Sequence, residues 1–147
     1  MAFTDRLREQ HDLATSTASR LRDLVFCHRP GDSAIAIATQ LALLLNVLRV
    51  HLAEEDEYLY PVLIAIDDRS AAALAKQYQT EMGALAWKAE DFMRRWSSSA
   101  VIALDFAEFK IALDQFLGAL EARIECENST LYPVADALLH DERSKAA

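Results

Sequence analysis

The chain has 147 residues, enough for one domain with a sizeable core, and 52% of them are apolar. Gly and Pro number only three each, which disfavours disorder and any architecture with many turns. A formal charge of −8 argues against nucleic acid or an anionic membrane as a partner, because both attract clustered Lys and Arg.

The start of the chain carries charged side chains and has no apolar signal core. The longest apolar run, residues 35–50, is interrupted by polar side chains and is too short to span a bilayer. Two cysteines, Cys27 and Cys126, do not make a disulfide framework. We therefore expect a soluble, cytoplasmic protein.

The hydrophobic pattern predicts four long helices. Thr4 is placed to cap the first of them. The second has an inward face that continues through Tyr58 to Val62, and the inward face of the fourth ends at Val134. The helices are separated by three short breaks rich in Pro, Gly, Asp or Ser, at residues 29–32, 67–70 and 97–99.

Short loops make long helices antiparallel neighbours, so the predicted fold is all-α: an up-down-up-down four-helix bundle. It forms a single domain over residues 1–147, with a polar tail that we expect to fray after about residue 140.

Two segments, residues 48–62 and 120–134, share six of their fifteen residues at equivalent positions. The shared residues are Leu48, Glu55, Leu59, Tyr60, Pro61 and Val62, which recur as Leu120, Glu127, Leu131, Tyr132, Pro133 and Val134. Where the first segment has His51, the second has Arg123. Each proline removes an N–H group, so we expect each to kink its helix. We interpret the repeated tyrosines as packing residues.

His51 and Glu55 lie four residues apart and therefore stack on one helix face. In an alternating bundle, Glu127 and His11 belong at the same level. Imidazole and carboxylate groups suit iron, manganese or zinc. Bare carboxylates on an inward face are costly unless they are paired, protonated or bound to a cation. The pattern therefore predicts a metal centre.

The segment His-Leu-Ala-Glu-Glu-Asp-Glu-Tyr-Leu-Tyr-Pro, which begins at His51, resembles the His-x-x-x-Glu…Leu-Phe-Pro signature of the hemerythrin-like, or HHE cation-binding, family. The resemblance extends along the whole chain. It implies a four-helix bundle around a non-haem di-iron centre, with roles in oxygen binding, iron or redox sensing, or iron handling. By this resemblance His11 and His51 are terminal ligands, and Glu55 and Glu127 are bridging ligands.

The sequence departs from that pattern at two places. Arg123 stands where the resemblance leads us to expect a histidine, and a guanidinium cannot bind a metal. The third helix offers the pair Glu81-Met82 where a histidine is expected. If Glu81 points inward it adds a fifth ligand, whereas an inward Met82 leaves four, since thioether is a poor ligand for hard iron.

Two functions remain open from the sequence. The first is a metal-binding protein that holds one or two non-haem iron ions and senses or handles oxygen, iron or redox state. The second is a metal-free interaction or regulatory module in which Arg123 neutralises the buried carboxylates. No nucleophile–base pair or phosphate-binding loop is present, so we do not expect an enzyme. Phe26 and Trp87 are candidates for a self-association surface. A protein partner or a homodimer stays open, and the sequence does not identify the partner.

Overall fold

The computed structural model describes the backbone of residues 1–146 and the side chains of residues 1–140. Every regular element in this part of the chain is a helix. The elements are α1 (Asp5–Cys27), α2 (Ile35–Glu54), η1 (Glu55–Leu59), α3 (Tyr60–Ala65), α4 (Arg69–Arg95), α5 (Ser99–Leu104), α6 (Phe106–Cys126), η2 (Glu127–Leu131) and α7 (Tyr132–Ala146). The segments η1 and η2 are π-helical turns. The fraying predicted after about residue 140 concerns side chains outside those described.

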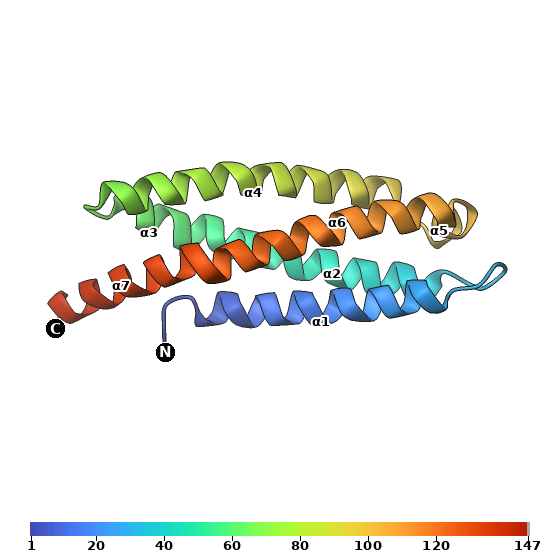
Figure 1. Ribbon diagram of the computed structural model, residues 1–147, viewed down its shortest axis with the longest axis horizontal. Helices are drawn as coiled ribbons and strands as arrows, with labels where there is room; N and C mark the ends of the chain where they lie inside the picture. Colours follow the sequence, from blue (N-terminus) through green and yellow to red (C-terminus); the bar gives the residue numbers. More distant parts are fainter. Residues whose placement is uncertain (147) are drawn as a thin grey trace.

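Figure 1 shows these elements joined end to end into four long rods that pack side by side. The rods are α1, then α2 with η1 and α3, then α4, and finally α5, α6, η2 and α7. The chain reverses direction at each intervening loop, so both termini lie toward the same end of the molecule. The predicted helical bundle is confirmed. One detail differs, because the fourth predicted helix is interrupted at Asp105.

Local side-chain contacts explain some of the helix boundaries. Asp68 caps α4, and its Oδ1 atom accepts a hydrogen bond of 3.0 Å from the N–H of Ala71. Gly31 adopts a φ of 90° in the loop before α2, a conformation that favours glycine. Thr4 is the N-cap residue of α1 as predicted, but its side chain makes no capping hydrogen bond. Its N–H and hydroxyl groups donate to the carboxylate of Asp136, at 2.9 and 2.8 Å, and so tie the start of α1 to α7.

Two apolar clusters fill the bundle, one on each side of a polar layer. Along three of the rods, a member of one cluster precedes the polar residues and a member of the other follows them. The flanking pairs are Leu7 and Ala14 around His11, Leu48 and Leu59 around His51 and Glu55, and Leu120 and Leu131 around Arg123 and Glu127. The polar side chains are thus enclosed between apolar walls.

The π-helical turn η1 changes which residues of its rod face inward. Tyr58 and Val62, predicted to be buried, are 61% and 38% exposed. The buried residues are instead Leu59, Tyr60 and Leu63. A π turn holds one residue more than the α-helical pattern allows, so every later side chain is rotated around the rod. This rotation turns Tyr60 toward the interior.

The turn η2 has the same effect in the fourth rod, where Tyr132 is buried and Val134 is only half-buried. The N–H of Tyr132 bonds to the carbonyl of Glu127, five residues back. The carbonyl of Asn128, which an α-helix would have used, accepts a hydrogen bond of 3.3 Å from Arg8. At both prolines, where a kink was predicted, the structure has a π turn that ends just before the proline.

The second rod, Ile35–Ala65, is long and apolar enough to cross a membrane by length and composition alone. It extends beyond residues 35–50, the run considered from the sequence. The core helix of a soluble protein meets the same criterion. Here the rod packs against α1 and carries three buried polar residues, Gln40, His51 and Glu55.

Candidate metal centre

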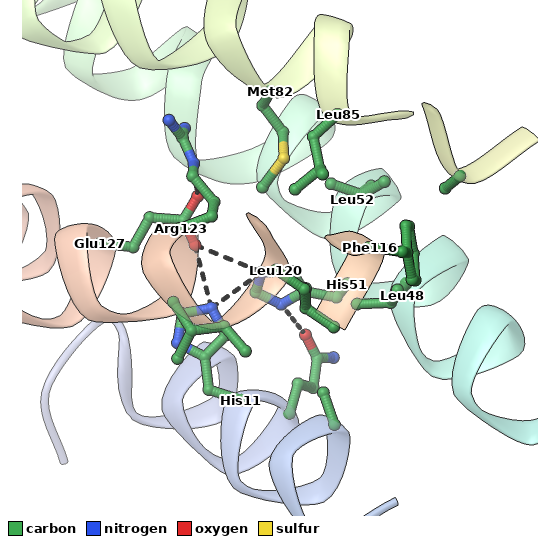
Figure 2. A pocket seen from close by; sticks show the side chains of 14 residues that line it. His11, Leu48, His51, Leu52, Met82, Leu85, Phe116, Leu120, Arg123 and Glu127 are labelled. Atoms are coloured by element: carbon green, nitrogen blue, oxygen red, sulfur yellow. Dashed lines mark hydrogen bonds and ion pairs between the residues drawn. The ribbon is translucent and has the colours of Figure 1, made fainter. Parts of the chain in front are cut away.

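Four side chains of metal-binding type converge between the two apolar clusters. His11 comes from α1, His51 from α2, Glu55 from η1 and Glu127 from η2. One ligand atom from each lies within 4.8 Å of the others, and all four residues are buried. Figure 2 shows the two imidazoles and Glu127 pointing into the same small space. Four of the five residues proposed from the sequence are thus brought together from three rods.

The distances within this cluster are short. The Nε2 atoms of His11 and His51 are 3.1 Å apart, and His11 Nε2 lies 3.0 Å from Glu127 Oε2. His51 Nε2 is 3.3 Å from Glu55 Oε1 and 3.8 Å from Glu127 Oε2. Both carboxylates have an exposed fraction of 0%. They must therefore be compensated inside the protein.

Amide side chains fix the orientation of both imidazoles. The Nδ1–H of His11 donates to Asn128 Oδ1 and that of His51 donates to Gln10 Oε1, each at 2.8 Å. An amide oxygen only accepts, so each Nδ1 atom carries the hydrogen. In neutral imidazoles both Nε2 atoms then present lone pairs to each other and to the carboxylates. Such an arrangement repels itself unless a proton or a metal ion lies between the groups.

Arg123 lies on the opposite side of the same two carboxylates. Its Nε–H donates to Glu127 Oε1 at 2.6 Å, and one terminal NH₂ donates to the Tyr78 carbonyl at 2.8 Å. The same NH₂ is 3.4 Å from the Tyr60 hydroxyl, which donates to Glu55 Oε2 at 3.2 Å. Each carboxylate therefore has one oxygen near the histidines and the other near Arg123 or the Tyr60 hydroxyl that Arg123 contacts. We call the region around His11 and His51 the histidine side and the region around Arg123 the arginine side.

Glu81, the fifth ligand proposed from the sequence, is not part of this cluster. Its side chain is 53% exposed and pairs with Arg123 NH1 at 3.1 Å. Met82 is buried instead and extends toward the cluster from α4 (Figure 2). The sequence left these two positions open, and the structure places the thioether inside and the carboxylate on the rim. The histidine side thus has four ligand-type residues.

Sequence reasoning missed the role of Tyr60 and Tyr132, which it treated as packing residues. Both hydroxyl groups reach Glu55, at 3.2 Å from Tyr60 and 2.7 Å from Tyr132. The signal was available in part, because both tyrosines recur at the same place in the two related segments. It could not be used without the π turns, which rotate these side chains inward.

A model of the hemerythrin HHE cation-binding domain matches residues 2–135. The chain belongs to this family. Comparisons with curated proteins and with solved structures found no match. The matched region includes all four clustered residues, so the HHE resemblance read from the short motif at His51 is confirmed.

The residues of this HHE domain fit a cation on the histidine side. Bonds from zinc-like ions to nitrogen and oxygen are about 2.0–2.2 Å long, which places neighbouring ligand atoms roughly 3.0–3.6 Å apart. Three separations among the Nε2 and carboxylate oxygen atoms, 3.0, 3.1 and 3.3 Å, lie within that range, and the 3.8 Å between His51 Nε2 and Glu127 Oε2 is slightly longer. Two imidazoles with two carboxylates are also a donor set suited to iron, manganese or zinc.

A cavity of about 20 Å³ adjoins the cluster. The polar and charged residues that line it are Gln10, His11, His51, Arg123 and Glu127, and the other lining side chains, which include Met82 and Phe116, are apolar. This volume holds about one water molecule. The cavity can therefore admit a water-sized species to the HHE centre but no organic substrate.

Charges within the HHE centre shift the ionisation of its members. Burial raises the pKa of Glu127, but hydrogen bonds from His11 and His51 and the charge of Arg123 bring it down to about 2. Burial lowers the pKa of His51, yet hydrogen bonds to Glu127 and Glu55 raise it to about 9. Without a metal, His51 thus holds a proton at neutral pH, and that proton supplies the positive charge the histidine side needs.

We predict that Arg123→Ala destabilises the metal-free protein by about 3–5 kcal/mol, because it leaves buried Glu127 without the guanidinium that donates to it at 2.6 Å. Urea unfolding followed by circular dichroism measures the change. Arg94→Ala is the matched control, since Arg94 forms an exposed pair with Asp91 and should matter by less than about 1 kcal/mol. Equal losses in the two variants would contradict the buried network.

The metal-free protein should also lose stability as the pH rises from 6.5 to about 9. The pKa of His51 is higher in the folded chain than its ordinary value of 6.5, so the proton stabilises the fold fully below 6.5. That contribution disappears as the pH passes the folded value. Thermal unfolding of chelator-treated protein should show a falling Tm over this interval, with a shallower fall in His51→Gln. A Tm independent of pH would contradict a protonated His51.

Proposed function

We propose that this HHE protein binds a single ion of iron, or a chemically similar metal, on its histidine side. His11, His51, Glu55 and Glu127 would hold the ion. One observation carries the proposal: two Nε2 atoms lie 3.1 Å apart while both Nδ1 hydrogens are committed to amide oxygens. When both imidazoles are neutral, these two nitrogen atoms and the two carboxylates are acceptors with no hydrogen between them, and they form a site for a cation.

The proposed count of one ion follows from the arginine side. There the guanidinium of Arg123 already compensates Glu127 Oε1 directly and Glu55 Oε2 through the Tyr60 hydroxyl. Burial lowers the pKa of Arg123 but the charge of Glu127 raises it, so the guanidinium stays charged. A second metal ion on that side would meet this positive charge and find no imidazole.

A role in sensing or handling oxygen, iron or redox state fits such a centre. A bound iron ion would supply electron transfer and affinity for dioxygen. The adjoining cavity of about 20 Å³ leaves no room for an organic substrate, which favours a binding or sensing protein over an enzyme. We place this activity in the cytoplasm, since the chain is acidic and its two cysteines are free.

One observation favours a second candidate, a metal-free regulatory module. Among the described residues, every fully buried polar side-chain atom already has a hydrogen-bond partner. A proton on His51 together with Arg123 could therefore complete the network without a metal. This module would use the bundle as a rigid surface for a protein partner or a second copy.

Metal analysis separates the two candidates. We predict about one iron per chain after expression in iron-supplemented medium, and a higher Tm when iron is added, as expected for a ligand of the folded state. His51→Ala should lower iron affinity at least about tenfold. His28→Ala is the matched control, because His28 packs against Phe106 outside the cluster. Absence of stoichiometric metal together with an unchanged Tm would favour the metal-free module.

Replacing the arginine tests the single-ion count. Arg123→His removes the fixed charge and places an imidazole four residues before Glu127, as His51 stands before Glu55. We predict that the variant retains more iron per chain than the parent protein, measured by elemental analysis after gel filtration. Arg94→His controls for a surface histidine. An unchanged iron content in folded Arg123→His would contradict the proposal that the guanidinium occupies the position of a second ion.

A further inference from the structure

The hydroxyl group of Tyr132 lies at the middle of the histidine side. It is 2.7 Å from Glu55 Oε1 and 3.4 Å from Glu127 Oε2. It is also 3.2 Å from His11 Nε2 and 3.5 Å from His51 Nε2. The oxygen of Tyr132 therefore faces the ligand atom of every residue in the proposed metal site, and the residue has an exposed fraction of 0%.

When both imidazoles are neutral, hydrogen bonding alone does not account for this position. A phenol has one hydrogen, which it can give to only one acceptor, and the contact of 2.7 Å identifies that acceptor as Glu55. The remaining three neighbours are acceptors too when the imidazoles are neutral. An oxygen atom that lies this close to four acceptors is placed as one more ligand of a cation that all five groups would share.

The related tyrosine of the other segment provides an internal comparison. Tyr60 OH lies 3.2 Å from Glu55 Oε2 and 3.4 Å from the guanidinium of Arg123. It therefore sits on the arginine side, where a fixed organic cation takes the place of a metal. The two tyrosines stand at equivalent places in the sequence but face different cations.

We propose that the phenol oxygen of Tyr132 is a fifth ligand of the metal ion on the histidine side. The inference rests on the proposed function, since it needs a metal at that site. On coordination the O–H bond breaks, the oxygen bonds to the ion as phenolate, and the proton leaves to solvent; no electron is transferred. A bound cation favours this loss, as it does for other metal-bound oxygen and sulfur groups. Phenolate is a hard oxygen donor and so selects for a ferric ion.

A ferric phenolate absorbs visible light through charge transfer from the ring to the metal, which gives a direct readout. The full chain is loaded with ferric citrate, separated from free iron and analysed for iron content. We expect a visible band in the parent protein, with resonance Raman signals of a metal-bound tyrosine. Tyr132→Phe should lose the band and bind ferric iron at least about tenfold more weakly.

Tyr60→Phe is the matched control and should keep the band at full intensity per iron. A tyrosine that only holds Glu55 in place would change affinity but would never produce the band. Stoichiometric ferric iron in the parent protein without a charge-transfer band overturns the role of Tyr132 and leaves the proposed function standing. A band that persists in Tyr132→Phe also overturns it. If the parent protein takes up no iron, the proposed function fails, and the ligand role fails with it. If Tyr132→Phe does not fold, the absence of a band in the parent protein still overturns the role, and a band that is lost in Tyr60→Phe overturns it as well.

Discussion

The constraint on which the structure depends is the burial of two carboxylates, those of Glu55 and Glu127, at an exposed fraction of 0%. An ion taken out of water costs several kcal/mol unless partners replace the lost solvation. Here each carboxylate divides its oxygens between two sides, so each needs compensation on both. The arginine side holds a permanent cation. The histidine side holds none in its neutral form, and this deficit makes an otherwise apolar bundle a receptor for a proton or a metal.

The two related segments explain how the sides arise and why they differ. Each supplies a buried glutamate, a π turn and an inward tyrosine, and both belong to rods packed around the same polar layer. They differ at the position four residues before the glutamate, which is His51 in one segment and Arg123 in the other. Imidazole offers a lone pair to a cation, whereas guanidinium is itself the cation. This single difference makes the His51 position a metal-ligand position and the Arg123 position a source of positive charge for the carboxylates.

The sequence predicted the bundle and four of the clustered residues because the spacing of apolar residues shows which side chains of a regular α-helix face inward. After Glu55 and Glu127 this spacing no longer predicts the inward residues, because the π turns rotate the later side chains and bring Tyr60 and Tyr132 inward. The prolines marked the disruption but not its form. The sequence could not decide which of Glu81 and Met82 points inward, for a different reason. Both lie at the edge of the apolar stripe of their helix, and packing against neighbouring rods determines which one is buried. A single sequence does not report that packing.

The apolar walls on both sides of the polar layer determine how the centre can behave. Side chains such as Leu59 and Leu131, both at 0% exposure, keep bulk water from the carboxylates. Low local polarity strengthens the attraction between these carboxylates and any cation among them. It also means that an ion must shed its water to enter, and that the helices must open locally to admit or release it. The burial that makes the empty site costly is therefore the same feature that would make a bound ion slow to leave.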